Sequence, residues 1–285
     1  MLRAQAMTRC DLNLGFIGLG AIGLPMATNL CQAGVPLAVH SRSRHAETAP
    51  GLQGARPCAS PAEAAEAADV LLICVSDDAA VETVLFGADG AASALRPGSV
   101  VVDCSTIAPA TALACAERLA RQGISYLDAP VTGGTEGAKA GTLTLLVGGE
   151  TEALERVRPI LEVIGGTIHH FGPVGRGQQV KAVNQVLVAG SYAAVAEAMA
   201  LGERLDLPMD QVVEALKGGA AGSWALEHRA PGMLAGRYPL GFKLSLHHKD
   251  LGIALTTAAS VQLELPISRR VEQLEADLMQ QGHGD

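Results

Sequence analysis

The sequence is poor in aromatic residues and in positive charge. Phe, Trp and Tyr make up 3% of its 285 residues, whereas hydrophobic residues make up 48%, so the core must consist of Ala, Val, Leu and Ile. The formal net charge is −8. A chain of this charge has no general attraction to a phosphate backbone, and we therefore expect no nucleic-acid partner.

Metal-type cysteine spacing and long apolar runs are also missing. The six cysteines form no C-x-x-C pair, which favours free thiols in a reducing cytoplasm. The adjacent pairs His169-His170 and His247-His248 cannot converge on one metal ion, because neighbouring side chains point apart. No run of about 18 uninterrupted apolar residues predicts a membrane-spanning helix. Residues 1–11 lack the apolar segment of a signal peptide and are expected to form a flexible leader.

From residue 12 to residue 172, short apolar runs alternate with Ala-rich stretches. Such alternation is typical of an α/β fold with a mainly parallel sheet and helices on both faces. After Gly177 the strand pattern stops and helical patterns follow. The expected strands are 12–17, 36–40, 70–75, 99–102, 125–127, 143–147 and 167–170, and the expected helices include 61–68, 109–121, 178–205, 209–216, 246–260 and 266–279.

A glycine motif, Gly18-Leu-Gly-Ala-Ile-Gly23, directly follows the first expected strand. Gly18 permits a tight turn, Gly20 lets the backbone approach a pyrophosphate, and Gly23 lets the next helix pack closely. The helix that begins near Ala21 would direct its N-terminal amides at the phosphates. The alternative is a glycine-rich turn without a ligand. We expect a dinucleotide to be bound by Gly18, Leu19, Gly20, Ala21, Ile22 and Gly23.

This motif defines the expected architecture. We predict a Rossmann-type doubly wound parallel sheet that binds NAD(P), over residues 1–172. An all-α domain for substrate binding and oligomerisation follows over residues 173–285, and a long helix joins the two.

The end of the second strand indicates which nucleotide is bound. An NAD site usually has a carboxylate about 20 residues after the glycines, to accept a hydrogen bond from the ribose hydroxyl. The segment Val39-His-Ser-Arg-Ser-Arg44 has no acid and two arginines. Ser41, Arg42 and Ser43, with Arg44 beside them, would bind a 2′-phosphate. We therefore expect NADP to be preferred and NAD to be possible; the alternative is that these arginines are simply solvated.

Two further segments carry candidate chemistry. Lys181 and Asn184 lie three positions apart on one face of the long helix, where a lysine and an amide can hold and transfer a proton. Alone, this lysine would be an ordinary surface charge. The segment Asp128-Ala-Pro-Val-Thr-Gly-Gly134 follows a strand, and its consecutive N–H groups, with the Thr132 hydroxyl, can bind a carboxylate. An ordinary strand-to-loop turn is the alternative.

Together, four blocks of the sequence resemble the β-hydroxyacid dehydrogenase family, which includes 3-hydroxyisobutyrate dehydrogenase and tartronate semialdehyde reductase. The resemblance extends from Gly15 to about Met279. Its blocks are Gly15–Leu30, Asp128–Gly134 with Gly141-Thr-Leu143, Gly175–Asn184 and Lys249-Asp-Leu251. All four in the correct order are very specific to the family.

The resemblance implies an enzyme that interconverts a short β-hydroxy acid and its semialdehyde by hydride transfer with a nicotinamide cofactor. By the same resemblance, Lys181 is the catalytic acid/base, Asn184 orients the substrate, Thr132, Gly133, Gly134, Gln185 and Phe242 bind it, and Val75, Thr106 and Lys249 contact the cofactor. An imine reductase and a catalytically silent nucleotide-binding module share this architecture, but both generally lack the lysine.

The sequence departs from the family pattern at two positions. Many members have Ser where this chain has Thr132, and Asn where it has Gln185. Gln185 is closer to the tartronate semialdehyde reductase branch. Family members usually continue with a short helical tail after the Gly-His-Gly-Asp285 end of this chain, so a C-terminal piece is expected to be missing. The small residues of helix 183–200 predict that it is buried against other elements of the chain or against a second subunit, the latter in a homodimer or homotetramer.

Overall fold

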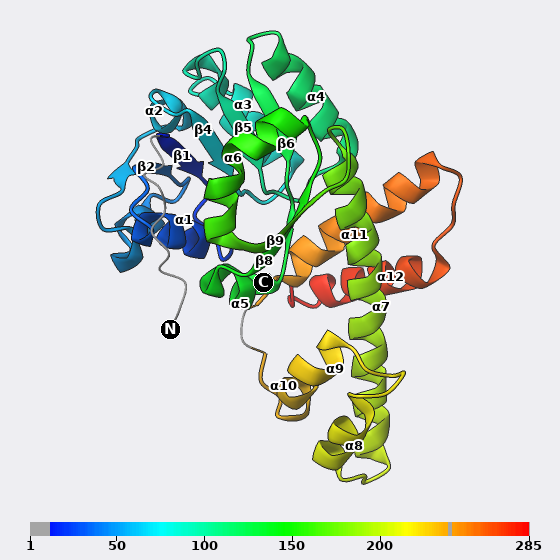
Figure 1. Cartoon of the computed structure of the whole chain (residues 1–285). Coiled ribbons are helices and arrows are strands. Elements are labelled where there is room, and N and C mark those ends of the chain that lie inside the picture. The colour runs from blue at the N-terminus through cyan, green and yellow to red at the C-terminus, as the bar shows by residue number, and fades with distance from the viewer. Residues whose placement is uncertain (1–11, 239–240, 285) are drawn as a thin grey trace. The chain divides into compact units, whose positions relative to one another are not determined.

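The computed structural model describes residues 12–238 and 241–284, and the expected leader therefore lies outside the described residues. The chain divides into two compact units, the first ending at Lys181 and the second beginning at Ala182 (Figure 1).

The first unit contains a six-stranded parallel sheet in the order β3-β2-β1-β4-β5-β6. From β1 the chain builds outward through β2 to β3, then returns to the other side of β1 and adds β4, β5 and β6. The strand order therefore reverses between β1 and β4, and in such sheets ligands bind at this point, beyond the carboxyl ends of the strands. The strands are β1 (Leu14–Ile17), β2 (Leu37–His40), β3 (Arg56–Pro57), β4 (Val70–Ile73), β5 (Val100–Asp103) and β6 (Ser125–Asp128).

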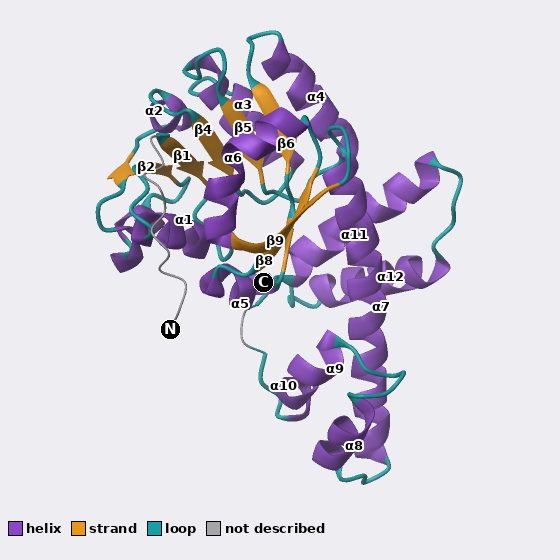
Figure 2. Cartoon of the chain, in the orientation of Figure 1, coloured by secondary structure: helices purple, strands orange, loops and turns teal. Residues whose placement is uncertain are grey.

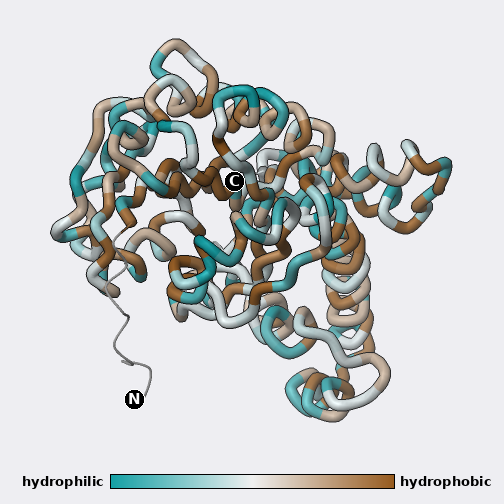
Figure 3. The backbone as a smooth tube through the Cα atoms, turned by 45° about the horizontal axis from the view of Figure 1, so that its top comes forward, coloured by the Kyte–Doolittle hydropathy of each residue, from teal (hydrophilic) through white to brown (hydrophobic). Residues whose placement is uncertain are grey.

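Helices cover both faces of this sheet, as Figure 2 shows. One face packs on α1 (Gly23–Gln32) and α6 (Thr151–Ile164), and the other on α2 (Pro61–Ala65), α3 (Asp78–Phe86) and α4 (Pro109–Ala120). Successive side chains of β4 alternate between the two faces and all are buried. Burial on both faces explains why β4 is apolar at every position, and Figure 3 shows hydrophobic segments in brown inside this unit. The doubly wound fold expected from the sequence is confirmed.

A second, three-stranded sheet follows in the order β7-β8-β9. Its strands are β7 (Val131–Thr132), β8 (Leu143–Val147) and β9 (Gly165–His170), and α5 (Gly134–Ala140) connects the first two. β7 is antiparallel to β8, whereas β9 is parallel to it. The strands expected at 143–147 and 167–170 thus belong to this separate sheet. The two-residue strands β3 and β7 were not expected, because segments so short show no periodicity.

Among its described residues, the second unit contains helices joined by loops and no strand. The long helix α7 (Arg176–Arg204) starts in the first unit and supplies residues to both hydrophobic clusters of the second. One cluster joins α7 to α11 (Leu244–Ser260) and α12 (Pro266–Gln280). The other joins α7 to the short helices α8 (Met209–Leu216), α9 (Trp224–His228) and α10 (Ala230–Leu234).

Much of α7 is apolar and solvent-exposed. Val183, Leu187 and Leu201 are each more than 60% exposed. By length and composition alone, α7 would also be able to cross a membrane, which the search for an uninterrupted apolar run did not anticipate. The core helix of a soluble protein passes the same test, and so this property is weak evidence for a membrane segment.

Candidate active site

The glycine motif forms the turn between β1 and α1. Gly18 has a φ of 101°, and a side chain there would clash with the carbonyl oxygen of Cys74, which follows β4. A side chain on Gly23 would clash with the carbonyl oxygen of Gly18. Gly20 differs, because a Cβ there would meet no atom within 4 Å. Gly18 and Gly23 are therefore required by close packing, whereas Gly20 leaves open space beside an exposed backbone.

The start of α1 is suited to an anionic ligand. Its N-cap residue, Ile22, makes no side-chain capping hydrogen bond, and the first turn of the helix contains no acidic residue. The positive end of the helix dipole is therefore not neutralised by the protein's own side chains. Ala21 is exposed, while the Leu19 side chain is buried in the core, so Leu19 can offer a ligand only its backbone. This arrangement fits the pyrophosphate of a dinucleotide.

At the end of β2, two arginines have different environments. The buried Glu47 accepts hydrogen bonds from the Ser41 backbone N–H and from Arg44 Nε, both at 2.9 Å. Arg44 has a φ of 60°, and its guanidinium is paired with Glu47 and so stabilises the turn. The exposed Arg42 side chain forms no hydrogen bond or ion pair with any described residue. Arg42, more than Arg44, is available for a phosphate, with the exposed Ser43 beside it.

The loops after β4 and β5 lie at the same carboxyl edge of the sheet. The Val75 N–H donates to Ser105 Oγ at 3.0 Å, which ties the two loops together. Ser105 N–H in turn donates to the buried Asp103 at 2.9 Å. Thr106 is the next residue and is half-buried. The expected cofactor residues of the first unit are therefore gathered along one edge, around the reversal in strand order.

Lys181 is a buried ammonium group, with 8% of the residue exposed. Its Nζ donates to the Val131 carbonyl oxygen at 2.9 Å, next to Thr132 and the two glycines that follow. Gly133 and Gly134 both have positive φ, of 125° and 64°. A non-glycine residue at either position would be strained, and the structure therefore brings the catalytic candidate beside the expected carboxylate-binding segment.

The first turn of α7 is held by Asp128. The two carboxylate oxygens of this buried residue accept from the Gly175 and Gln178 N–H groups, both at 2.8 Å. Burial raises the pKa of Asp128 to about 6, while the two N–H donors act in the opposite direction. Gln178 is itself buried and bonds to the loop after β5. Both residues lie inside the blocks of the sequence that resemble the family, but no role for either was predicted from it.

The remaining candidates lie in the second unit. Asn184 Nδ2 donates to Gln185 Oε1 at 2.7 Å, and Gln185 Nε2 donates to Asp250 at 2.8 Å. Lys249 Nζ pairs with the other Asp250 oxygen at 2.9 Å. Asp250 therefore links three of the expected site residues, a role that the sequence did not reveal. Phe242 lies apart from this chain of bonds and packs edge-on against His247.

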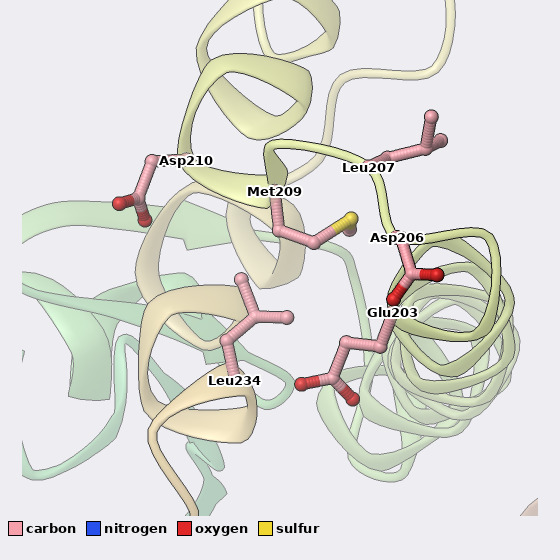
Figure 4. Close-up of a pocket in the computed structure, with 6 residues that line it drawn as sticks. All are labelled: Glu203, Asp206, Leu207, Met209, Asp210 and Leu234. Atoms are coloured by element: carbon pink, nitrogen blue, oxygen red, sulfur yellow. The ribbon is translucent and has the colours of Figure 1, made fainter.

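A hollow of about 490 Å³ also occurs in the second unit, where α7, α8 and α10 meet (Figure 4). Three of its six lining residues are acidic, namely Glu203, Asp206 and Asp210, and the others are Leu207, Met209 and Leu234. None of the expected site residues lines it. Its negative charge would repel a carboxylate substrate, so the hollow is not the expected active site.

Comparison with known proteins identifies the family. Residues 13–172 match the family described as the NAD binding domain of 6-phosphogluconate dehydrogenase. Residues 175–285 match the one described as the NAD-binding domain of NADP-dependent 3-hydroxyisobutyrate dehydrogenase. The chain belongs to the β-hydroxyacid dehydrogenase family.

Curated members of this family match nearly the whole chain. The 2-hydroxy-3-oxopropionate reductase of Escherichia coli is 40% identical over 263 residues, which cover 92% of this chain and 90% of the relative. The 2-(hydroxymethyl)glutarate dehydrogenase of Eubacterium barkeri is 38% identical over 265 residues, covering 93% and 88%. A crystal structure of 3-hydroxyisobutyrate dehydrogenase from Salmonella typhimurium has a TM-score of 0.88 and 32% identity, covering 96% of each chain.

Membership of the β-hydroxyacid dehydrogenases settles the class of reaction. The chain is a nicotinamide-dependent oxidoreductase that acts on the CH–OH group of hydroxy acids. The resemblance seen in the sequence is confirmed, and the dehydrogenase is favoured over the imine reductase and the silent binding module.

Proposed function

We propose that this enzyme interconverts a short β-hydroxy acid and its semialdehyde, with NADP preferred and with Lys181 as the acid/base. The observation that carries the proposal is the position of Lys181. Its buried ammonium group is held at the Val131 carbonyl, directly beside Thr132 and the Gly133-Gly134 turn, in a unit that also contains a dinucleotide-binding turn.

When bound, the nicotinamide supplies or accepts the hydride at the carbon that carries the oxygen. In the reducing direction, Lys181 gives one proton to the carbonyl oxygen, so that aldehyde, hydride and proton together yield the alcohol. In the oxidising direction the same nitrogen takes the proton back. A positioned group of this kind typically contributes about 10²–10⁴ to the rate.

The Thr132–Gly134 segment would bind the substrate carboxylate. The Gly133 and Gly134 residues are exposed and Thr132 is half-buried, so that their polar groups remain accessible at the end of β7. Backbone N–H groups and a hydroxyl can neutralise a carboxylate without adding another charge near Lys181. Among possible substrates, a small semialdehyde such as tartronate semialdehyde has its carboxylate separated from the reducible carbon by a single carbon atom.

The NADP preference depends on Arg42. It is exposed at the end of β2, and its guanidinium has no acidic partner among the described residues. Glu47, the nearby acid, already accepts from Ser41 and Arg44 and is buried. Arg42 would thus pair with a 2′-phosphate, while the acid is not free to accept from a 2′-hydroxyl.

A test would follow NADPH and NADH absorbance with a panel of small semialdehydes and glyoxylate, using wild type beside Lys181→Ala. We expect turnover of at least one semialdehyde, a higher kcat/KM with NADPH, and collapse of kcat in the variant. NADPH binding without turnover of any panel member would contradict the proposed substrate class. A higher kcat/KM with NADH would contradict the cofactor preference alone.

We further propose that the enzyme works in the cytoplasm as a homodimer or homotetramer. The five described cysteines are free, as a reducing compartment requires. The exposed apolar side chains of α7, including Val183, Leu187 and Leu201, favour contact with a second copy. Light scattering after size exclusion should give at least twice the mass of one chain; a strict monomer at micromolar concentration would contradict this assignment.

A further inference from the structure

Gln178 has one of the most completely satisfied buried side chains in the first unit. Only 1% of the residue is exposed. Its Oε1 accepts from the Ile107 N–H at 3.2 Å, and its Nε2 donates to the Ser105 carbonyl oxygen at 2.8 Å. Both partners belong to the loop after β5, more than 70 residues earlier in the sequence. The amide therefore bonds to the two residues that flank Thr106.

The same hydrogen-bond chain continues to the loop after β4. Ser105 Oγ accepts from the Val75 N–H at 3.0 Å. Val75 and Thr106 are the residues of these loops that we expect to contact the cofactor. Through Ser105, Gln178 thus ties both loops to the first turns of α7.

The start of α7 has no freedom to adopt another register. Asp128 accepts from the N–H of Gly175 and from that of Gln178 itself. A Cβ on Gly177 would clash with the carbonyl oxygen of Leu146 and would lie 2.7 Å from that of Asp128. The helix backbone is therefore pressed against β6 and β8. Lys181 stands three residues, or about one turn, beyond Gln178 on the same helical face.

A core position that served packing alone would not need an amide, because burying one is costly unless both of its polar ends are bonded. Leu or Met would fill a similar volume without this cost. The Gln178 amide instead matches one acceptor and one donor of a single loop, and so it fixes distance and direction between that loop and the helix.

We propose that Gln178 is a positioning residue for the reaction, which sets Lys181 against the loops that carry Val75 and Thr106. This inference rests on the proposed acid/base role of Lys181. A displacement of the proton donor by about 1 Å costs on the order of 100-fold in rate. Loss of the amide should therefore slow the chemical step, while the Thr132–Gly134 segment, which Gln178 does not touch, still binds the carboxylate.

The test is Gln178→Met, which retains the length of the side chain and removes both hydrogen bonds. We expect kcat for semialdehyde reduction to fall about 10- to 100-fold, KM for the semialdehyde to change less than threefold, and the pH profile of kcat to move. Gln179→Met is the matched control, because Gln179 is the next residue of α7 and only accepts from the side chain of Arg176. The control should keep the wild-type kcat and profile.

A second variant, Ser105→Ala, interrupts the chain at Val75 without altering α7. It should lower kcat in the same direction but by less, and raise KM for NADPH. Rates are referred to the concentration of folded enzyme, measured by NADPH binding. The proposal is overturned if folded Gln178→Met keeps the wild-type kcat and pH profile, or, where that variant does not fold, if Ser105→Ala is unchanged. Lys181→Ala separates the two claims: activity retained there overturns the proposed function itself.

Discussion

Buried polar side chains occur in both units, and a fully bonded network in the first can be compared with a partly bonded cluster between α11 and α12 in the second. In the first unit, Asp128 accepts two backbone N–H groups, and Gln178 bonds at both ends of its amide. In the second unit, His247 Nδ1 lies 2.5 Å from Glu275 Oε1, yet His247 Nε2, His248 Nδ1 and Glu275 Oε2 have no hydrogen-bond partner among the described residues. His248 Nδ1 and Glu275 Oε2 are 3.9 Å apart, too far for a hydrogen bond.

A buried group whose hydrogen bonds are all made can fix the positions of its neighbours, whereas a group that lacks hydrogen bonds fixes them less. A satisfied buried group resists displacement, because moving it leaves its partner unpaired at a cost of about 1–3 kcal/mol. A group that already lacks partners imposes no such penalty when it is removed. The network of the first unit should therefore hold Lys181 in place, whereas the cluster between α11 and α12 should be replaceable.

The largest effect is expected when the satisfied network is broken at Asp128. Asp128→Asn turns one accepting oxygen into an NH₂ group that faces a backbone N–H. We expect a loss of about 3 kcal/mol in the free energy of unfolding, together with a fall in kcat, because the first turn of α7 is released. Urea denaturation followed by circular dichroism measures the first, and an unchanged midpoint would contradict the role assigned to this carboxylate.

The next prediction concerns pH. Burial raises the pKa of Asp103 from 3.8 to about 6, opposed by its hydrogen bonds from Ser105 and Tyr126. The folded state thus binds the proton more tightly than the unfolded state. This contribution to stability is complete below about pH 4 and is lost as pH rises through 6.

Asp103→Asn removes this titration. The difference in unfolding free energy, wild type minus variant, should fall by up to about 3 kcal/mol between pH 4 and pH 7, the equivalent of two pKa units. Denaturation at a series of pH values measures it. A difference that stays constant or rises over this range would show that Asp103 is not held at a raised pKa.

The arginines after β2 present the same contrast on a smaller scale. Arg44 is paired with Glu47, whereas Arg42 has no partner among the described residues. Arg42→Ala should raise KM for NADPH about 10- to 100-fold, the loss of one to two charge-assisted hydrogen bonds, with little change for NADH. Arg44→Ala is the control and should have the smaller effect on NADPH. Equal effects of the two variants would refute the distinction.

The smallest effect is expected in the partly bonded cluster between α11 and α12. Glu275→Gln makes the same carboxylate-to-amide change as Asp128→Asn, also at a buried position. The retained oxygen can still accept from His247, and the other oxygen makes no hydrogen bond with a described residue. We expect a change of less than about 1 kcal/mol in unfolding free energy. A loss as large as that of Asp128→Asn would contradict the comparison between the two units.

How far the sequence could predict this arrangement depends on how many residues separate two contacting residues along the chain. The glycine turn could be predicted, because strand, turn and helix are contiguous and a side chain on Gly23 would clash with Gly18 of the same turn. The helix boundaries of α8 were predicted to the residue, and those of α7 within two residues. Motif and periodicity are sufficient for such local features.

Features that depend on distant partners could not be read in this way. Gln178 bonds to residues 71 and 73 positions away, and Asp128 to residues 47 and 50 positions away. No local sequence pattern predicts a hydrogen bond between residues so far apart in the chain. Similarly, Glu47 lies beyond the end of β2, and it accepts a hydrogen bond from Arg44, whose own backbone is left-handed in the turn. The sequence placed Arg42 at the expected phosphate with Arg44 beside it, and only the structure shows that Arg44 is paired with Glu47.

The central claim is that Lys181 transfers the proton during hydride transfer. A single-turnover experiment tests it most directly: the enzyme saturated with NADPH is mixed with a semialdehyde that it reduces, and absorbance is followed for wild type and Lys181→Ala. The account predicts unchanged NADPH affinity and a transfer rate about 10²–10⁴ times slower in the variant. A variant that keeps more than about a tenth of the wild-type rate would contradict it.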